Sequence, residues 1–271
     1  MGTPVLLPLL TAIGYFALSA HFFYSRWRRN SAASCRWERV GVSILLALHA
    51  ISLHEAIPQA TGLNLGVGNA LSVTAWLAVV SYWGASFAYR LESLYVAVLP
   101  LAGVSLLVPV ILPESHILPY SGMAAFHWHL LVSLLAYSLL TIAALHAGLM
   151  VSLEKRLHHA TLTGAMNHLP PLLTLETLLF RLLWTGFLFL TLSLLTGMFF
   201  SENIFGKPLE FNHKVVFGIL AWLIFATLLA GRHIYGWRGK RASRLTIAGF
   251  ALLLLAYIGS KFVLEILLGR A

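Results

Sequence analysis

The chain has 271 residues, of which 59% are hydrophobic and 10% charged, and its mean hydropathy is +0.84. A soluble domain usually carries about a quarter charged residues, so this composition excludes an ordinary soluble protein and indicates a membrane protein. The single cysteine, Cys35, excludes an internal disulfide, a CxxC redox pair and a CxxCH haem-attachment motif.

Eight apolar stretches are long enough to cross a membrane, for which a helix needs about 20 mostly apolar residues. We therefore predict an all-α, polytopic membrane helix bundle that forms one integral membrane domain over residues 1–271. The first stretch has no basic segment ahead of it, so we expect a retained span and not a cleaved signal peptide. In chain order the predicted spans are residues 4–24, 40–57, 66–87, 93–112, 128–151, 182–200, 213–231 and 245–268.

The basic residues fall in alternate loops between these spans. Fourteen of the 18 Lys and Arg residues follow spans one, three, five and seven. Because basic residues in short loops mark the cytoplasmic side, we expect both termini on the outer, periplasmic side of a bacterial inner membrane. The net charge of +9 is then a topology signal, and we expect the lipid bilayer and not nucleic acid as the partner.

The longest connection lies between spans five and six. Pro170 and Pro171 interrupt any helix that enters it. Residues 172–180 are apolar enough to lie along the membrane interface. We predict a cytoplasmic loop over residues 154–181 that contains this interfacial segment.

Two histidines stand at the start of the fifth span. His127 and His129 are about 200° apart on a helix, so they cannot share one face. His129, Ser133 and Tyr137 follow at i, i+4 and i+8, and such a polar stripe should face the interior of the bundle. His129 is thus a candidate ligand for a metal, above all haem iron. The alternative is a hydrogen bond between helices, to Tyr137 or to a neighbouring span.

Further candidate residues lie in and beside the other spans. His49 lies well inside the second span, where it is either a metal ligand or a structural group with a partner such as Ser52. His213 opens the seventh span on the predicted outer face and could ligate a metal or cap the helix. Lys207 and Lys214, on the same face, could pair with anionic groups such as haem propionates. The motifs of soluble-type catalysis, HExxH, a Walker loop and Ser-His-Asp, are absent from the sequence.

Several stretches together resemble a known family. LHAISLH, HLLVSLLAYSLLTIAALHAG, LPPLLTLETLLFRLLWTGFLFLTLSLLTGMFFSENIFG and FNHKVVFGILAWLIFATLLAGRHIYGWRGKRASRLTIAGF are similar to the CcsA-like cytochrome c assembly membrane proteins, and most to their YpjD-type inner-membrane branch. The resemblance implies a protein that handles haem near the outer leaflet for c-type cytochromes. It implies haem b as cofactor and other cytochrome c assembly components as partners. His129 falls on the family's first external histidine, and His49 resembles a recurring histidine of the second span.

The chain departs from the family's haem ligases in two places. Between Gly197 and Trp222 it has no tryptophan where their Trp-rich segment is expected. Near the C-terminus it has Lys261 and Glu265 in place of a second external histidine. We therefore expect a haem-binding or haem-handling protein and lean against an enzyme.

Two other functions fit the same residues. A transporter, or a transporter's accessory subunit, for a metal ion or small solute would be lined by His49 and by the polar residues of the third span, Asn69, Ser72 and Thr74. In a non-catalytic membrane scaffold, polar residues would only specify helix packing, as the small residues Gly66, Gly68 and Ala70 permit.

Overall fold

The helical architecture follows the predicted spans closely. The computed structural model describes residues 3–28, 36–59, 62–88, 94–112, 117–118, 123–158, 172–199 and 213–256. Within these ranges the chain forms eight α-helices, one in each predicted span. Five are long and apolar enough to cross a membrane: Val5–Arg26, Arg36–Ala56, Ala124–Lys155, Leu172–Phe199 and Lys214–Tyr235. The all-α, polytopic membrane fold is confirmed, as expected where a backbone in lipid must satisfy its own hydrogen bonds.

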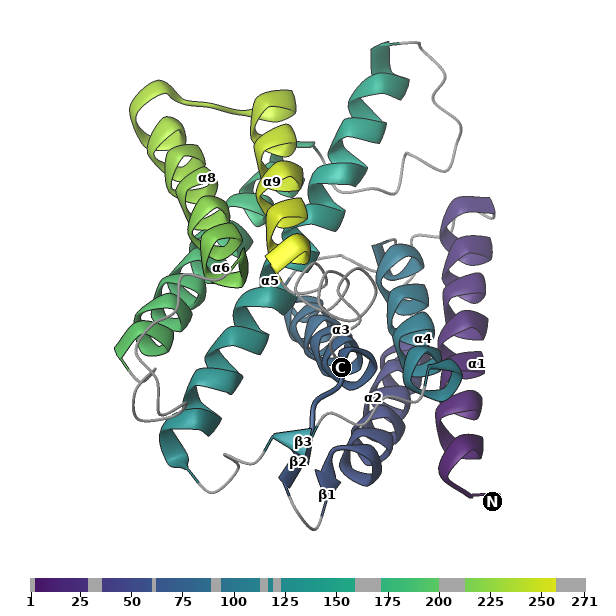
Figure 1. Ribbon diagram of the computed structural model, residues 1–271. Coiled ribbons are helices and arrows are strands. Elements are labelled where there is room, and N and C mark those ends of the chain that lie inside the picture. The colour runs from purple at the N-terminus through teal and green to yellow at the C-terminus, as the bar shows by residue number, and fades with distance from the viewer. Residues whose placement is uncertain are drawn as a thin grey trace. The chain divides into compact units, whose positions relative to one another are not determined.

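The helices group into two compact units. In the N-terminal unit, α1 (Thr3–Phe22) continues into a π-helical turn, η1 (Phe23–Arg28). It packs against α2 (Arg36–Ala56) and α4 (Tyr95–Ile111), and α3 (Val67–Ala85) packs against the same two helices (Figure 1). Each helix thus buries part of its apolar surface against two neighbours.

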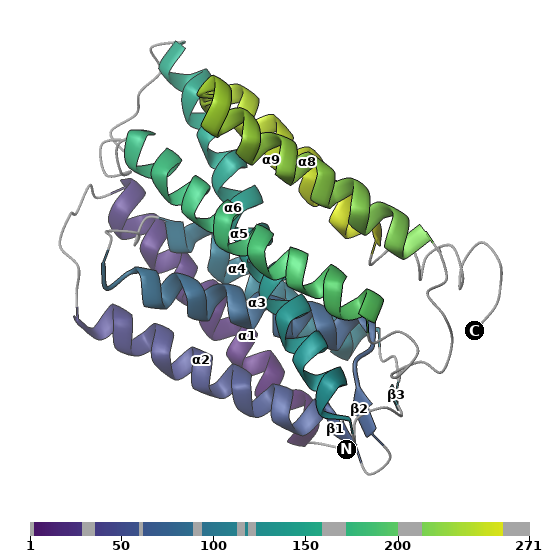
Figure 2. The ribbon, with the colours of Figure 1, turned by 90° about the vertical axis from the view of Figure 1, so that its left-hand side faces the viewer.

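A small antiparallel sheet closes one end of this unit. Its order is β1 (Pro58–Gln59), β2 (Gly62–Asn64) and β3 (Ile117–Leu118), and Leu63 pairs with both Pro58 and Leu118. The strands lie at the same end of the unit as the first residues of α1 (Figures 1 and 2).

The C-terminal unit contains four helices. These are α5 (Ala124–His158), α6 (Leu172–Phe199), α8 (His213–Tyr235) and α9 (Gly239–Leu254). Helix α8 packs against α6 and runs beside α9 (Figure 2). Residues 172–181, predicted to include an interfacial segment, form the first turns of α6. The reason is that this apolar run contains no proline after Pro171 and continues directly into the span.

The turn between α8 and α9 depends on glycines. Gly236 and Gly239 have φ values of +64° and +54°, in the left-handed region that favours glycine. The backbone N–H of Trp237 donates to the carbonyl of Gly231 at 3.2 Å. The Trp237 ring packs so closely on Gly231 that a methyl group there would overlap the ring. The GWRG sequence is therefore a compact, packed connection.

Candidate functional site

His129 in α5 makes a hydrogen bond to the last turn of α6. Its Nδ1 lies 2.8 Å from Oγ1 of Thr196, three residues before the end of that helix. His129 is half-buried, whereas His127 is exposed. The two histidines therefore lie on different faces of α5, as their spacing predicted.

The partner of His129 bears on which ring nitrogen carries the proton. Oγ1 of Thr196 also lies 2.8 Å from the carbonyl oxygen of Leu192, to which its hydroxyl can donate. When it does so, the Thr196 oxygen accepts a hydrogen bond from Nδ1–H of His129. A neutral imidazole protonated at Nδ1 keeps its lone pair at Nε2, which is the form that binds a metal. Within the described part of the chain, no hydrogen bond to this Nε2 is found.

The rest of the polar stripe on α5 also faces other helices of the unit. Oγ of Ser133 lies 2.6 Å from Oγ of Ser193 in α6. The hydroxyl of Tyr137 donates to the carbonyl oxygen of Leu253 in α9 at 3.4 Å. The prediction of an inward-facing stripe is confirmed. The polar contact of His129 is made with Thr196 and not with Tyr137.

A positive charge stands near His129. Lys214 lies in the first turn of α8, and its ammonium group is within electrostatic range of the His129 imidazole. Lys214 as a residue belongs to the exposed class. His213 is the first residue of α8, but its side chain is not part of the described structure. Lys207 lies outside the described residues.

His49 has a different environment, in the core of the N-terminal unit. It is fully buried, with Nε2 2.9 Å from Oγ of Ser72 in α3 and Nδ1 3.3 Å from the hydroxyl of Tyr15 in α1. Ser52, expected as its partner, donates instead to its own helix at the carbonyl of Leu48. Both ring nitrogens are therefore engaged, and the ring joins three helices.

The other polar residues of the third span bond within the same unit. The side-chain amide of Asn69 donates to the carbonyl of Asn64 at 3.0 Å, and the hydroxyl of Thr74 donates to the carbonyl of Ala70 at 2.8 Å. A β-carbon on Gly68 would lie 3.0 Å from the backbone of Pro109, so this glycine allows α3 and α4 to approach closely. Gly68 thus contributes to helix packing, whereas these hydrogen bonds of Asn69 and Thr74 are local.

A buried carboxylate lies at the opposite end of α6 from Thr196. Glu176 is 7% exposed, and its Oε1 lies 2.8 Å from Nη1 of Arg232 and 2.7 Å from Nε of Arg238. From residue 176 to residue 196 a helix rises about 30 Å, which is the thickness of the hydrocarbon core. The His129 end and the arginine-rich end of this unit are therefore one membrane thickness apart.

Sequence reasoning missed two residues that contact His129, namely Thr196 and Gly197. The available signal was the pair Ser193 and Thr196, two hydroxyls three residues apart in an otherwise apolar helix. Such a pair lies on one face and indicates a partner helix with its own polar stripe.

Known proteins match this chain over most of its length. The family described as cytochrome C assembly protein matches residues 37–268. Inner membrane protein YpjD of Escherichia coli (strain K12) is 31% identical over 237 residues, which cover 85% of this chain and 89% of the relative.

Shorter matches join the chain to the wider family. Cytochrome c biogenesis protein CcsA of Prochlorococcus marinus is 35% identical over 89 residues, which cover 33% of this chain and 28% of the relative. The protein of the same name from Heterosigma akashiwo is 34% identical over 92 residues, which cover 34% and 29%. No solved structure matches the chain. With its apolar helices, the chain is a multi-pass inner-membrane protein that belongs to the cytochrome c assembly protein family.

Proposed function

We propose that this protein binds haem b near the outer leaflet and handles it for the assembly of c-type cytochromes, with His129 as an axial ligand. The observation that carries the proposal is the hydrogen bond between Nδ1 of His129 and Oγ1 of Thr196; with Nδ1–H as its donor, the lone pair of the ring lies at Nε2. Histidines that bind metals almost always donate their other ring N–H to a neighbouring group. The family match supports haem and assembly components as the partners.

The surroundings of His129 fit the chemistry of haem. Haem carries two anionic propionates, and Lys214 supplies a positive charge on the same end of the unit. His129 is half-buried beside an exposed Trp128, so a planar apolar ring could reach it from the membrane. When bound, the iron would supply the redox chemistry of the cofactor, and the protein would position it.

The second axial ligand is a separate part of the proposal. His213 stands next to Lys214 in the sequence and is our first choice. His49 could ligate only after it releases Ser72 or Tyr15, because both of its nitrogens are engaged. We therefore place His49 second. Lys207, like Lys214, is proposed to pair with a propionate.

The orientation of the site follows from the charges at the two ends of the C-terminal unit. The arginine-rich end carries Arg232, Arg238 and their neighbours, and basic segments remain on the cytoplasmic side. His129 lies one membrane thickness away from them, which supports an outer location for the haem.

The test is the absorption spectrum of the detergent-purified, full-length protein, oxidised and then reduced with dithionite. We expect a Soret band and reduced bands typical of histidine ligation. His129→Ala should lose most of the haem, whereas His127→Ala, two residues away on another face, should keep it. Size-exclusion chromatography of both variants checks that each remains folded.

Two results would contradict the proposal. No Soret band in the wild-type protein, even after haemin is added, would reject haem binding. Equal haem content in the wild-type protein and in folded His129→Ala would reject the ligand assignment and leave His49 and His213 to be tested.

A further inference from the structure

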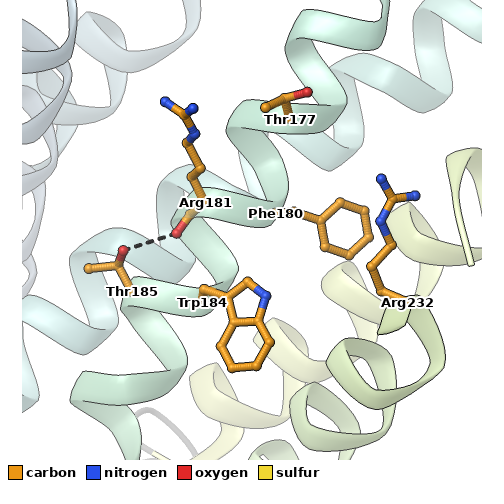
Figure 3. Close-up of a pocket in the computed structure, with 6 residues that line it drawn as sticks. All are labelled: Thr177, Phe180, Arg181, Trp184, Thr185 and Arg232. Atoms are coloured by element: carbon orange, nitrogen blue, oxygen red, sulfur yellow. Dashed lines mark hydrogen bonds between the residues drawn. The ribbon is translucent and has the colours of Figure 1, made fainter. Parts of the chain in front are cut away.

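A groove lies between α6 and α8 at the arginine-rich end of the C-terminal unit. Its volume is about 450 Å³, and it is lined by Thr177, Phe180, Arg181, Trp184, Thr185 and Arg232 (Figure 3). The side chains of Arg181 and Arg232 lie on either side of the Phe180 ring in this view. The groove has no part in the proposed haem site, which lies at the other end of α6.

The groove carries a net positive charge. Glu176 supplies one negative charge, but it is shared by two arginines, Arg232 and Arg238. The guanidinium group of Arg232 also stacks on Phe180, with its carbon 4.6 Å from the ring centre. A guanidinium has five N–H donors, so the contact of Nη1 with Glu176 leaves donors for a further anion. Arg181 adds a second exposed guanidinium on the other side of the ring.

The charged donors in the groove come from the arginines. The hydroxyls of Thr177 and Thr185 donate to the carbonyls of Leu173 and Arg181, at 2.9 and 3.0 Å. Their protons are therefore used within α6. An anion in the groove would be held by guanidinium groups, which match the geometry of phosphate oxygens.

An apolar strip leads out of the groove along α6. Trp184 is 56% exposed, and exposed leucines follow it at i+4, i+8 and i+11, namely Leu188, Leu192 and Leu195. At about 100° per residue these four side chains lie within one narrow arc of the helix. Tryptophan is enriched at the level of lipid headgroups. The groove and the strip together match a molecule with an anionic head and long apolar tails.

We propose that this groove binds the headgroup of an anionic phospholipid, with the headgroup held by Arg181 and Arg232 and the acyl chains along the leucine strip. Basic pockets between membrane helices on the cytoplasmic side hold acidic headgroups by this chemistry. A soluble phosphate would use the arginines but not the strip, and a neutral phospholipid would use the strip with little help from the arginines. The continuity of the two features favours the anionic lipid.

The test compares lipid retention by native mass spectrometry of the full-length protein in a non-ionic detergent. Phosphatidylglycerol and phosphatidylcholine with the same acyl chains are added to separate samples. We expect the wild-type protein to retain phosphatidylglycerol in preference. Arg181→Gln should lower that retention about fivefold, and Arg181→Lys, which keeps the charge, should lower it less. Arg244→Gln removes one exposed positive charge from α9 outside the groove and should change retention less than about twofold.

Three results would overturn the proposal. Equal retention of the two lipids would mean that the site does not recognise charge. An equal loss in Arg181→Gln and Arg244→Gln would mean that lipid responds to the overall charge and not to the groove. Displacement of phosphatidylglycerol by millimolar inorganic phosphate would identify a site for free anions.

Discussion

Gly197 lies against the imidazole of His129, and a β-carbon built on this glycine would be 3.2 Å from Cε1 of the ring. That separation is tighter than ordinary van der Waals contact, so a side chain at residue 197 would push the ring. Because Thr196 holds Nδ1 from the adjacent position in α6, these two residues together set the orientation of His129.

Replacing Gly197 with alanine should therefore move the proposed ligand without removing it. We expect Gly197→Ala to bind haem several-fold more weakly than the wild-type protein in a haemin titration followed at the Soret band. Gly148→Ala is the control, because a β-carbon at Gly148 in α5 meets no atom within 4 Å. Unchanged affinity in Gly197→Ala would show that the ring's present position is not the one that binds iron.

Removing the acceptor for Nδ1 should weaken haem binding while the shape of the site is kept. Valine has the shape of threonine but no hydroxyl, so Thr196→Val leaves Nδ1–H without its partner. We expect about a tenfold loss of haem affinity, with Thr196→Ser close to the wild-type value. Thr141→Val removes a hydroxyl that bonds only its own helix at Tyr137, and it should bind haem normally. Equal affinities for all four proteins would contradict the role of Thr196.

The carboxylate of Glu176 should matter for stability. Glu176→Gln leaves Arg232 and Arg238 facing each other without the negative charge between them. We expect a loss of about 1–3 kcal/mol in folding free energy, seen as a lower thermal unfolding midpoint in detergent. Glu55→Gln alters an exposed carboxylate and should leave the midpoint nearly unchanged. A Glu176→Gln midpoint equal to that of Glu55→Gln would show that the ion pairs contribute nothing.

The two hydrogen bonds of the buried His49 ring should contribute to the folding free energy in a coupled way. Ser72→Ala removes the partner of Nε2, and Tyr15→Phe removes the partner of Nδ1. We expect each single variant to lower the folding free energy by about 1 kcal/mol or more. Because the two bonds share one buried ring, the double variant should differ from the sum of the single ones. Ser81→Ala, whose hydroxyl bonds only its own helix, is the control. Strict additivity would argue against a shared network.

The single cysteine offers a direct test of the predicted orientation. Cys35 follows the first span, in the loop that carries five arginines, so we expect it on the cytoplasmic side. A membrane-impermeant maleimide should label it in inverted vesicles and not in intact spheroplasts. The variant Cys35→Ser with Ser115→Cys places the thiol between spans four and five and should give the reverse pattern. Labelling of Cys35 from outside would invert the topology and with it the side assigned to His129.

The partners of the two candidate histidines show where prediction from the sequence ended. The i, i+4, i+8 spacing placed His129, Ser133 and Tyr137 on one inward face, because helix geometry fixes that relation within one helix. The same reasoning proposed Ser52 for His49, but the ring bonds Ser72 and Tyr15 from two other helices. A helix residue has many neighbours across an interface, and spacing along one chain does not select among them.

What the sequence determined by itself was the placement of the helices in the described part of the chain. In a hydrocarbon environment, apolar length is nearly sufficient to specify a span, since the backbone has no other way to satisfy its hydrogen bonds. Only the tertiary structure decided that Thr196 bonds Nδ1 of His129, that both nitrogens of His49 are engaged, and that Glu176 holds two arginines. These relations depend on which helices meet and at what rotation, and side-chain packing between helices settles both.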